Sequence, residues 1–399
     1  MDSYFDKIID RGENSGTYSA KWQGFEARFP GYDVKGALPM WVADMDFMCP
    51  PEVIDVVVKR AQHGIYGYTS EAVVDAFKRA AAGWFERRYN WKTKTEWMLC
   101  TPGVVPVINA SIQEFTDPGD GVIIQPPVYY PFAAGINNNG RIVKNNSLIE
   151  RDGFYEIDFE DLEKLAKDLK TKLIILSNPH NPVGRVWTKE ELYKICKICH
   201  DNHVLLFSDE IHGDLIMKGH THIASGILGD EIKNNLIAAY APSKTFNLAG
   251  LGASIIVVPN KEIRERLAKR ILANRLPTSN VFGPIAGEAA YLYGDKYVDE
   301  LMAYIEDNID YAITYAQEHL GGVHIIKPEG TYLVWIDFRG TGMTGEEINS
   351  FILEKVKIAA DLGNWFGQEG DGFARFNFAC PRSIVTKALE QIKAALAEI

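Results

Sequence analysis

Residues 172–213, KLIILSNPHNPVGRVWTKEELYKICKICHDNHVLLFSDEIHG, contain the pattern that predicts the fold. Segments 172–177 and 204–208 are short and almost continuously apolar, which is typical of strands buried on both faces of a parallel sheet. Between them, Thr188 and Glu191 form a capping-box signature, so a helix is expected near 188–200. The order strand, helix, strand predicts one unit of an α/β domain.

The same alternation continues on both sides of this unit. Further strands are expected at 121–125, 236–240 and 253–258, and a helix near 105–115. Strands separated by helices predict a doubly wound α/β fold with a mostly parallel sheet.

The character of the chain changes after about residue 282. Helical stretches are expected at 288–293 and 302–319, strands at 331–338 and 374–379, and a last amphipathic helix capped by Ser383 and ending at Ile399. These elements predict a smaller α+β domain. We therefore expect an N-terminal segment at 1–44 that packs with the small domain, a large domain at 45–282 and a small domain at 283–399.

The composition indicates an ordinary globular protein. The chain has 399 residues, 46% of them hydrophobic, and a formal net charge of −11, which argues against a nucleic-acid partner. No apolar run approaches the roughly 20 residues that cross a membrane, and the N-terminus lacks the pattern of a secretory signal. We expect a cytoplasmic protein without a membrane partner.

The five cysteines are expected to be thiols, because disulfides are rare in the cytoplasm. Cys196, Cys199 and His200 match the C-x-x-C-H pattern of haem attachment. We reject this reading, because Leu192, Ile195 and the two cysteines share one face of the expected helix. They are interpreted as core residues.

Polar residues collect where the expected strands end. Asn181 follows the strand at 172–177, Asp209 follows the strand at 204–208, and Ser243 and Lys244 follow the strand at 236–240. Open α/β sheets bind ligands outside the carboxyl ends of their strands. An asparagine, an aspartate and a lysine are therefore expected to point into one crevice.

Lys244 lies among small and apolar residues, in Ala-Pro-Ser-Lys-Thr-Phe-Asn-Leu-Ala-Gly at 241–250. A buried lysine has to be paired, neutralised or covalently engaged, and lysines in such places form Schiff bases with carbonyl compounds. Pyridoxal phosphate (PLP) is the commonest covalent aldehyde. A surface lysine beside a serine is the alternative.

The neighbouring polar residues match the needs of PLP. Asp209 can hold the proton on the pyridine nitrogen, as an acid does in many PLP sites, although a helix cap would explain it equally well. Asn181 can donate to the phenolate oxygen, or serve as an ordinary turn residue. His212 can reach the same oxygen or one of its partners.

The remaining parts of the cofactor also have candidates. The turn 101–106 opens a helix, so the backbone N–H groups of Gly103, Val104 and Val105 can bind a phosphate. Ser243 and Tyr68 are further phosphate donors. Tyr129 can stack on the pyridine ring or be an ordinary buried aromatic residue.

Arg375 is a charge in an otherwise apolar strand. Arginine binds a carboxylate through two parallel hydrogen bonds, so Arg375 is a candidate for the substrate carboxylate, with a structural ion pair as the alternative. Tyr68 and Asn181 are further candidates for substrate binding. Trp41, Tyr32 and Trp365 are expected to shape the pocket.

Taken together, the chain resembles the fold-type-I PLP enzymes of the aminotransferase superfamily. The resemblance rests on Tyr66-Gly-Tyr68-Thr, Asn178-Pro-His-Asn181-Pro-Val-Gly184, Ser208-Asp209-Glu-Ile-His212, Ser243-Lys244 and Arg375, in that order. Asp44-Met-Asp-Phe47, Ser243-Lys244-Thr-Phe-Asn247 and Asn377-Phe-Ala-Cys-Pro-Arg-Ser383 are most similar to the bacterial carbon–sulfur β-lyases of the cystathionine β-lyase branch.

The resemblance implies roles at the matching positions. Lys244 would carry PLP and Tyr68 would reach the phosphate of a neighbouring subunit, so a homodimer with shared active sites is expected. The chain departs from many members of the superfamily at two phosphate positions, where it has Ala241 and Gly252 instead of a serine and an arginine.

The expected activity is elimination of a thiol from L-cystathionine or a related cysteine S-conjugate, with pyruvate and ammonia as the other products. The same site residues serve a PLP aminotransferase of aromatic or neutral amino acids, and only the branch resemblance favours the lyase. A regulatory binding protein that retains the fold is a further alternative. A dinucleotide-binding dehydrogenase is excluded by the lack of a G-x-G-x-x-G motif, and no histidine spacing indicates a metal site.

Overall fold

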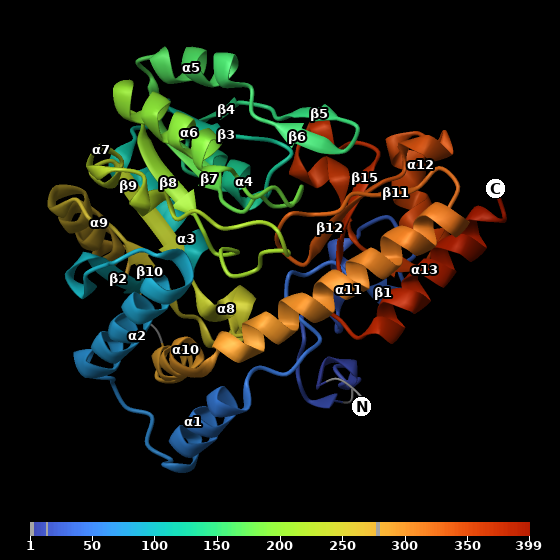
Figure 1. Ribbon diagram of the computed structural model, residues 1–399, viewed down its shortest axis with the longest axis horizontal. Coiled ribbons are helices and arrows are strands. Elements are labelled where there is room, and N and C mark those ends of the chain that lie inside the picture. The colour runs from blue at the N-terminus through green and yellow to red at the C-terminus, as the bar shows by residue number, and fades with distance from the viewer. Residues whose placement is uncertain (1–3, 13–14, 277–279) are drawn as a thin grey trace.

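Seven strands form the central sheet of the protein, whose computed structural model describes residues 4–12, 15–276 and 280–399 (Figure 1). In spatial order they are β2 (Met98–Thr101), β10 (Ser254–Val257), β9 (Leu236–Tyr240), β8 (Leu205–Asp209), β7 (Thr171–Ser177), β3 (Gly121–Ile124) and β4 (Ile142–Asn145). Neighbours from β9 to β4 pair in parallel, whereas β10 is antiparallel to both β9 and β2. The predicted α/β fold with a mostly parallel sheet is confirmed.

All five strands expected in this sheet are present, but the sequence reasoning missed the two at its edges. Strand β4 has no fully buried residue, so its side chains do not produce the continuous apolar run of a central strand. Strand β2 is four residues long and ends at Thr101, immediately before the turn that opens the next helix.

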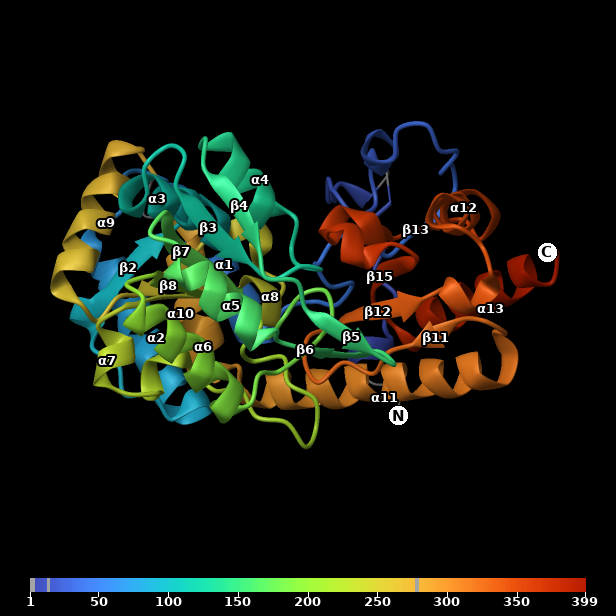
Figure 2. The same ribbon diagram turned by 90° about the horizontal axis from the view of Figure 1, so that it is seen from above.

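Helices cover both faces of the central sheet, as Figure 2 shows. One face packs against α3 (Val104–Phe115), α4 (Pro131–Asn138) and α9 (Lys261–Ala273). The other face packs against α2 (Glu71–Tyr89), α5 (Phe159–Lys167), α6 (Lys189–Asp201) and α10 (Phe282–Tyr293). Ile174 and Ile175 enter opposite layers, because successive side chains of a strand point to opposite faces.

Helix α6 begins as the sequence predicts. Thr188 and Glu191 exchange both hydrogen bonds of a capping box. Cys196 and Cys199 are buried in the core, where burial raises the pKa of both thiols, that of Cys199 to about 12. These two cysteines act as core side chains.

A second sheet lies at the other end of the molecule. Among the described residues it has the antiparallel order β11 (His324–Ile325), β12 (Leu333–Asp337), β15 (Phe373–Asn377) and β14 (Asp361–Leu362). Its helices are α11 (Asp295–His319), α12 (Gly345–Ser350) and α13 (Arg382–Leu396).

The prediction for the last helix is wrong at both ends. The helix α13 starts at Arg382 with Pro381 in the cap position, and it ends at Leu396. Ser383 therefore lies inside the first turn and is not the cap. Proline has a fixed φ near −65°, which suits the entry to a helix, and Pro381 has φ −53°.

The N-terminal part of the chain lies against the smaller sheet. Strand β1 (Leu38–Pro39) pairs in parallel with β13 (Ile358–Ala359), and Phe25 and Phe29 pack against Leu353. The division at residues 44 and 282 stays a prediction. Residues 1–3, 13–14 and 277–279 of those ranges lie outside the described part.

The remaining elements are short or peripheral. They are α1 (Pro51–Gln62), the hairpin of β5 (Ile149–Arg151) and β6 (Phe154–Glu156), α7 (Asp230–Lys233) and α8 (Pro242–Thr245).

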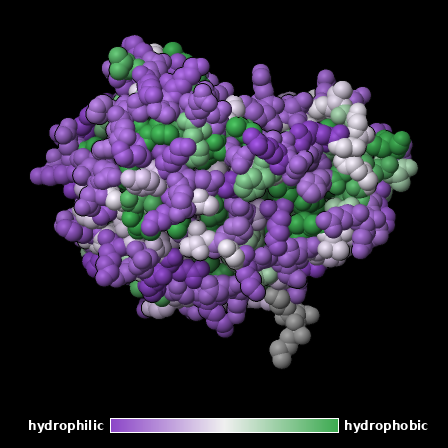
Figure 3. Space-filling model, turned by 45° about the horizontal axis from the view of Figure 1, so that its top comes forward, coloured by the Kyte–Doolittle hydropathy of each residue, from purple (hydrophilic) through white to green (hydrophobic). Residues whose placement is uncertain are grey.

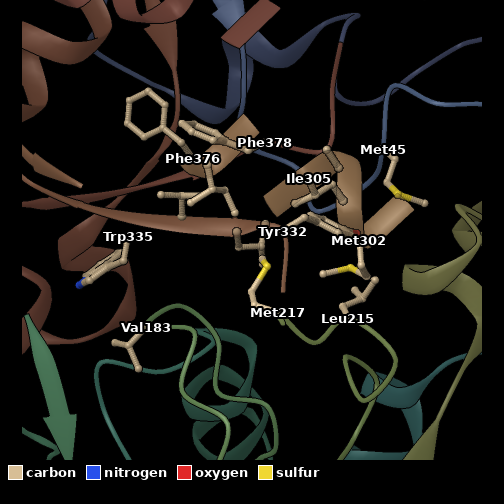
Figure 4. Close-up of a cluster of buried hydrophobic side chains, with 14 of the residues drawn as sticks. Met45, Val183, Leu215, Met217, Met302, Ile305, Tyr332, Trp335, Phe376 and Phe378 are labelled. Carbon is tan, nitrogen blue, oxygen red and sulfur yellow. The ribbon is translucent and has the colours of Figure 1, made fainter. Parts of the chain in front are cut away.

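A buried apolar cluster joins the two sheets (Figure 4). Tyr332 and Phe376 of the smaller sheet, Met302 of α11, Leu215 of the loop after β8 and Met45 of the N-terminal segment all belong to it. The cluster holds parts of the chain that are up to about 330 residues apart in one arrangement, because apolar burial stabilises the contacts. The N-terminal segment and the loop after β8 both contribute to the site described below, through Ala43 and His212.

Hydrophilic residues predominate on the face shown in Figure 3, with hydrophobic residues interspersed among them. No helix in the described ranges combines the length and the apolar character that a membrane span requires.

Candidate active site

The carboxyl ends of the parallel strands β7, β8 and β9 open into a cavity of about 210 Å³. Ser177 and Asp209 are register partners at the ends of β7 and β8. The segments that follow these strands bring Asn181 and Lys244 to the same cavity as Asp209. The three residues that the sequence reasoning placed in one crevice therefore meet.

Most of the other candidates also line this cavity. These are Tyr129, His212, Ser243, Gly103, Val104 and Val105. Sequence reasoning missed Ala43, which lines the cavity through a carbonyl that no residue pattern marks. Tyr68 is fully exposed and does not line the cavity of its own chain. Its contact with a partner subunit stays a prediction.

Lys244 lies half-buried in the short helix α8 and donates a hydrogen bond from Nζ to the carbonyl oxygen of Ala43, 2.7 Å away. Burial lowers the pKa of Lys244 to about 8, and the nearby charge of Arg375 acts in the same direction. The carboxylates of Asp44 and Asp209 oppose this shift. A substantial fraction of Lys244 is therefore a neutral amine near pH 8, and a neutral amine is both a nucleophile and a base.

Asp209 is a buried carboxyl group at the cavity. Burial raises its pKa to about 7, and the backbone N–H of Ile211 and the charge of Lys244 oppose the shift. Within the described ranges, Oδ1 accepts from the Ile211 N–H at 3.2 Å and no ion pair includes Asp209. The site therefore holds a carboxylate without a strong cationic partner, and a protonated pyridine nitrogen is a group of the required charge and size.

His212 supplies an unsatisfied atom at the same cavity. Its Nδ1 is buried and has no hydrogen-bond partner in the described part of the chain. Burial lowers the pKa of His212 well below its ordinary value, and the cations of Lys244 and Arg375 add to this effect. His212 is thus a neutral imidazole that can bind a polar group in the cavity.

The first turn of α3 lines the cavity from the carboxyl end of β2, which lies at the same edge of the sheet as the carboxyl ends of β7, β8 and β9. Gly103 is in the cap position with an extended backbone and no side-chain cap, so the N–H groups at the helix start are not taken by a side chain. Val104 and Val105 follow it at the cavity wall. A helix start with free N–H groups favours an anion such as phosphate.

Gly252 explains one departure from the superfamily pattern. Its φ of +54° belongs to the left-handed region, and a Cβ atom there would lie 3.3 Å from the carbonyl oxygen of Pro102. An arginine at this position would require both a strained backbone and a shift of that carbonyl. The phosphate therefore depends on groups other than a side chain at position 252.

Arg375 does not line the cavity itself but contacts a residue that does. Its guanidinium donates to Oδ1 of Asn181 at 3.0 Å and to the carbonyl oxygen of Trp41 at 3.0 Å, and it forms a buried ion pair with Asp361. Nε of Arg375 is buried without a partner among the described residues. The guanidinium is thus held in place with donor capacity left for a substrate carboxylate.

Side chains from the middle and from the C-terminal part of the chain hold the loop that carries Ala43. Asn247 binds the backbone of Met45 at 2.9 and 3.0 Å, and Asn377 donates to the carbonyl oxygen of Asp44 at 2.6 Å. Tyr332 donates its hydroxyl to the Ala43 carbonyl at 3.0 Å. The oxygen that positions Lys244 is therefore fixed by residues distant in sequence.

Tyr129 and Asn181 are tied together at the cavity wall. The backbone N–H of Tyr129 donates to the carbonyl oxygen of Asn181 at 3.1 Å. Burial raises the pKa of Tyr129 to about 12, so its phenol is neutral and can stack on an aromatic ligand.

His180, in the loop that carries Asn181, makes the protein sensitive to acid. Burial lowers the pKa of His180 from 6.5 to about 4, and its Nε2 lies 3.1 Å from the carbonyl oxygen of Pro127. The folded state disfavours the protonated ring, so this residue stabilises the fold fully above pH 6.5 and loses that contribution towards pH 4. The loss amounts to about 3 kcal/mol.

We expect His180→Gln to flatten the fall in the free energy of unfolding between pH 6.5 and 4, because glutamine does not titrate. Urea unfolding of both proteins at several pH values measures this slope. Equal slopes in the two proteins would show that other groups determine the acid sensitivity.

Comparison with known proteins identifies the family. The family model for aminotransferase class I and II matches residues 38–392. The chain belongs to this family. The resemblance inferred from the motifs around Asn181, Asp209 and Lys244 is confirmed.

The most informative relatives cover almost the whole chain. Cystathionine beta-lyase PatB of Bacillus subtilis is 42% identical, over 98% of this chain and 99% of its own. The solved structure of cystalysin from Treponema denticola, which contains pyridoxal 5'-phosphate, has a TM-score of 0.93 at 39% identity and covers 100% of both chains. A PLP-bound C-S lyase from Staphylococcus hominis has a TM-score of 0.89 at 30% identity, with 99% and 98% covered.

Proposed function

We propose that this protein is a PLP-dependent carbon–sulfur β-lyase that eliminates a thiol from L-cystathionine or a related cysteine S-conjugate. The 42% identity to a cystathionine beta-lyase over 98% of the chain carries this conclusion. The protein is an enzyme with a small-molecule substrate, and Lys244, Asp209 and Asn181 meet in one cavity as the reaction requires.

The residues present fit the cofactor. Asp209 would provide the carboxylate for the pyridine nitrogen, and His212 has a buried nitrogen without a hydrogen-bond partner in the described part of the chain. The start of α3 would provide the N–H groups for the phosphate. Tyr129 would lie against the ring, and Lys244 would hold the aldehyde carbon covalently. Ser243, at the cavity wall beside Lys244, is a further phosphate donor.

When bound, PLP accepts the electron pair that remains on the substrate Cα after proton loss. Lys244, once the substrate amino group has taken its place on the cofactor, would receive this proton on Nζ, and its lowered pKa favours the neutral amine that this role needs near pH 8. Arg375 and Asn181 hold the substrate carboxylate, so that the Cα–H bond points towards Lys244. The C–S bond then breaks, the thiolate leaves with the bonding pair, and water completes the release of pyruvate and ammonia.

An aminotransferase is the alternative, because it would use the same lysine as the base and the same arginine to bind the substrate carboxylate. Relatives named aspartate aminotransferase, from Pyrococcus horikoshii, and probable aspartate/prephenate aminotransferase, from Aquifex aeolicus, are 24% and 26% identical to this chain. The higher identity of the lyases favours elimination.

The two activities differ in their need for a keto acid. We expect the purified protein to release pyruvate and thiol from L-cystathionine with no keto acid added, measured by a coupled assay for pyruvate and a thiol reagent. Product formation that depends strictly on an added keto acid would establish the aminotransferase instead.

Arg375→Lys tests whether Arg375 binds the carboxylate of the substrate. Lysine keeps the charge but cannot form two parallel hydrogen bonds, so we expect KM for L-cystathionine to rise roughly 10- to 100-fold. The absorption band of the bound cofactor should be unchanged. Arg382→Lys is the matched control, because Arg382 pairs with Asp307 on the surface. An unchanged KM in Arg375→Lys would remove this residue from the substrate site.

The working unit is proposed to be a homodimer in the cytoplasm. Tyr68 supports the dimer, because it is fully exposed on a loop that also exposes Ile65 and Tyr66. In a dimer such a loop can reach the phosphate site of the partner subunit. The buried thiols of Cys100, Cys196 and Cys199 suit a reducing compartment.

A further inference from the structure

A second, more open cavity of about 490 Å³ lies beside the site described above. We call it the Arg28 cavity, and its main walls are Arg28, Phe29, Tyr32, Tyr130 and Trp365. Tyr130 follows directly after Tyr129 of the first cavity, so the two cavities share one segment of the chain. Tyr32 and Trp365, which were expected from the sequence to shape the substrate pocket, line this cavity and not the first.

Arg28 is an exposed cation that lies over two aromatic rings. Its guanidinium carbon lies 4.2 Å from the ring centroid of Trp365 and 5.1 Å from that of Tyr130. None of the ion pairs in the described part of the chain includes Arg28. The nearby carboxylate of Asp361 is paired with Arg375 instead. The rings orient a planar donor group that is still free to bind a carboxylate.

The Arg28 cavity is within electrostatic reach of the reacting groups. Burial raises the pKa of the Asp361 carboxyl group, and the charges of Arg375, Arg28 and Lys244 lower it in that order. Burial and Asp361 also raise the pKa of Tyr130, against the effects of Arg375 and Arg28. Phe366 and Tyr130 link the two arginines in space. The guanidinium carbon of Arg375 lies 5.0 Å from the ring centroid of Phe366, this centroid lies 5.6 Å from that of Tyr130, and Arg28 lies 5.1 Å from the Tyr130 centroid.

The two arginines together favour a substrate that carries an anionic group at each end. Arg375 takes the carboxylate next to the reacting Cα, and Arg28 is a second positive group in a chain with a net charge of −11. A positive pocket within an acidic protein attracts and orients anions. The aromatic walls contact the apolar carbon and sulfur atoms between the two carboxylates.

We propose that Arg28, Tyr130 and Trp365 form a subsite for the leaving half of the substrate, and that this subsite selects thioethers whose leaving thiol carries a carboxylate. The inference rests on the proposed lyase function and names its substrate class.

Two substrates of equal size test the subsite. S-(2-Carboxyethyl)-L-cysteine and S-(2-carbamoylethyl)-L-cysteine differ only in the charge of the leaving thiol. We expect Arg28→Gln to raise KM for the carboxylate substrate roughly tenfold or more and to change KM for the amide less than twofold. Arg266→Gln is the matched control, because Arg266 also lies over an aromatic ring, Phe115, but on α9. Equal effects of Arg28→Gln on the two substrates would overturn the proposal.

A binding measurement separates this proposal from the lyase function. 3-(Methylthio)propionate has the carboxylate and the thioether but no amino group, so it cannot react. We expect it to change the tryptophan fluorescence of the protein with cofactor bound, and the change should be lost in Trp365→Phe and weakened at least tenfold in affinity by Arg28→Gln. An affinity that Arg28→Gln leaves unchanged would contradict the subsite. If wild type releases no pyruvate from either cysteine conjugate, the lyase function fails, while this titration still decides the subsite.

Discussion

Replacing Lys244 by alanine is expected to lower pyruvate release from L-cystathionine by roughly 10⁴-fold or more. The variant loses both the covalent anchor for the cofactor and the base for the α-proton, and Nζ of Lys244 is the amine that the cavity presents among the described residues. Stopped assays for pyruvate over long incubations measure the residual rate. The absorption band of the bound cofactor should be lost after dialysis.

Lys269→Ala is the control for this experiment, because Lys269 is exposed on α9. The fold of Lys244→Ala should remain intact, since Lys244 is only half-buried and the Ala43 carbonyl that it contacts still accepts a hydrogen bond from Tyr332. A Lys244→Ala protein that retains more than about one hundredth of the wild-type rate would exclude Lys244 as the catalytic residue.

Asp209→Asn is expected to lower the rate of the reaction and to raise the stability of the cofactor-free protein. It should lower the rate roughly 10³-fold, because an amide cannot hold the proton on the pyridine nitrogen electrostatically. It should also stabilise the cofactor-free protein at pH 8. Burial raises the pKa of Asp209 from 3.8 to about 7, so the ionised form destabilises the fold above pH 7, and this penalty is absent below pH 3.8.

The penalty removed by asparagine is about 4 kcal/mol at pH 8. Urea unfolding of the cofactor-free proteins at pH 8 measures it, and Asp201→Asn at the exposed end of α6 is the control. An Asp209→Asn protein that is slower but less stable than wild type would mean that Asp209 is a structural residue.

Glu210 shows why Asp209, and not its neighbour, is suited to bind a ligand. Both carboxyl groups are buried. Glu210 accepts hydrogen bonds from His222, Tyr240 and the backbone N–H of Ser225, and although burial acts to raise its pKa, these donors lower it overall. Asp209 lacks such a set in the described structure, and its pKa rises. A buried carboxylate that the protein leaves unsatisfied is available to a cofactor.

Three features were predictable from the sequence. They are the central strands, the helix that starts at Thr188, and the convergence of Asn181, Asp209 and Lys244 on one cavity. These features depend on short-range periodicity and on the rule that parallel strands end at one edge of a sheet, so neighbouring residues carry the information. The edge strand β4 was not predictable, because an exposed strand carries little apolar signal.

Contacts between distant residues were decided by the tertiary structure. Three such contacts join segments far apart in the chain: the hydrogen bond from Lys244 to the carbonyl oxygen of Ala43, the hydrogen bond from Arg375 to Asn181, and the contacts of Arg28 with the rings of Tyr130 and Trp365. No periodicity relates such residues, because burial of the apolar cluster between the two sheets brings them together. The sequence by itself therefore determined the family and the reacting groups, whereas the packing of the chain decided how each group is held, charged and left free to bind.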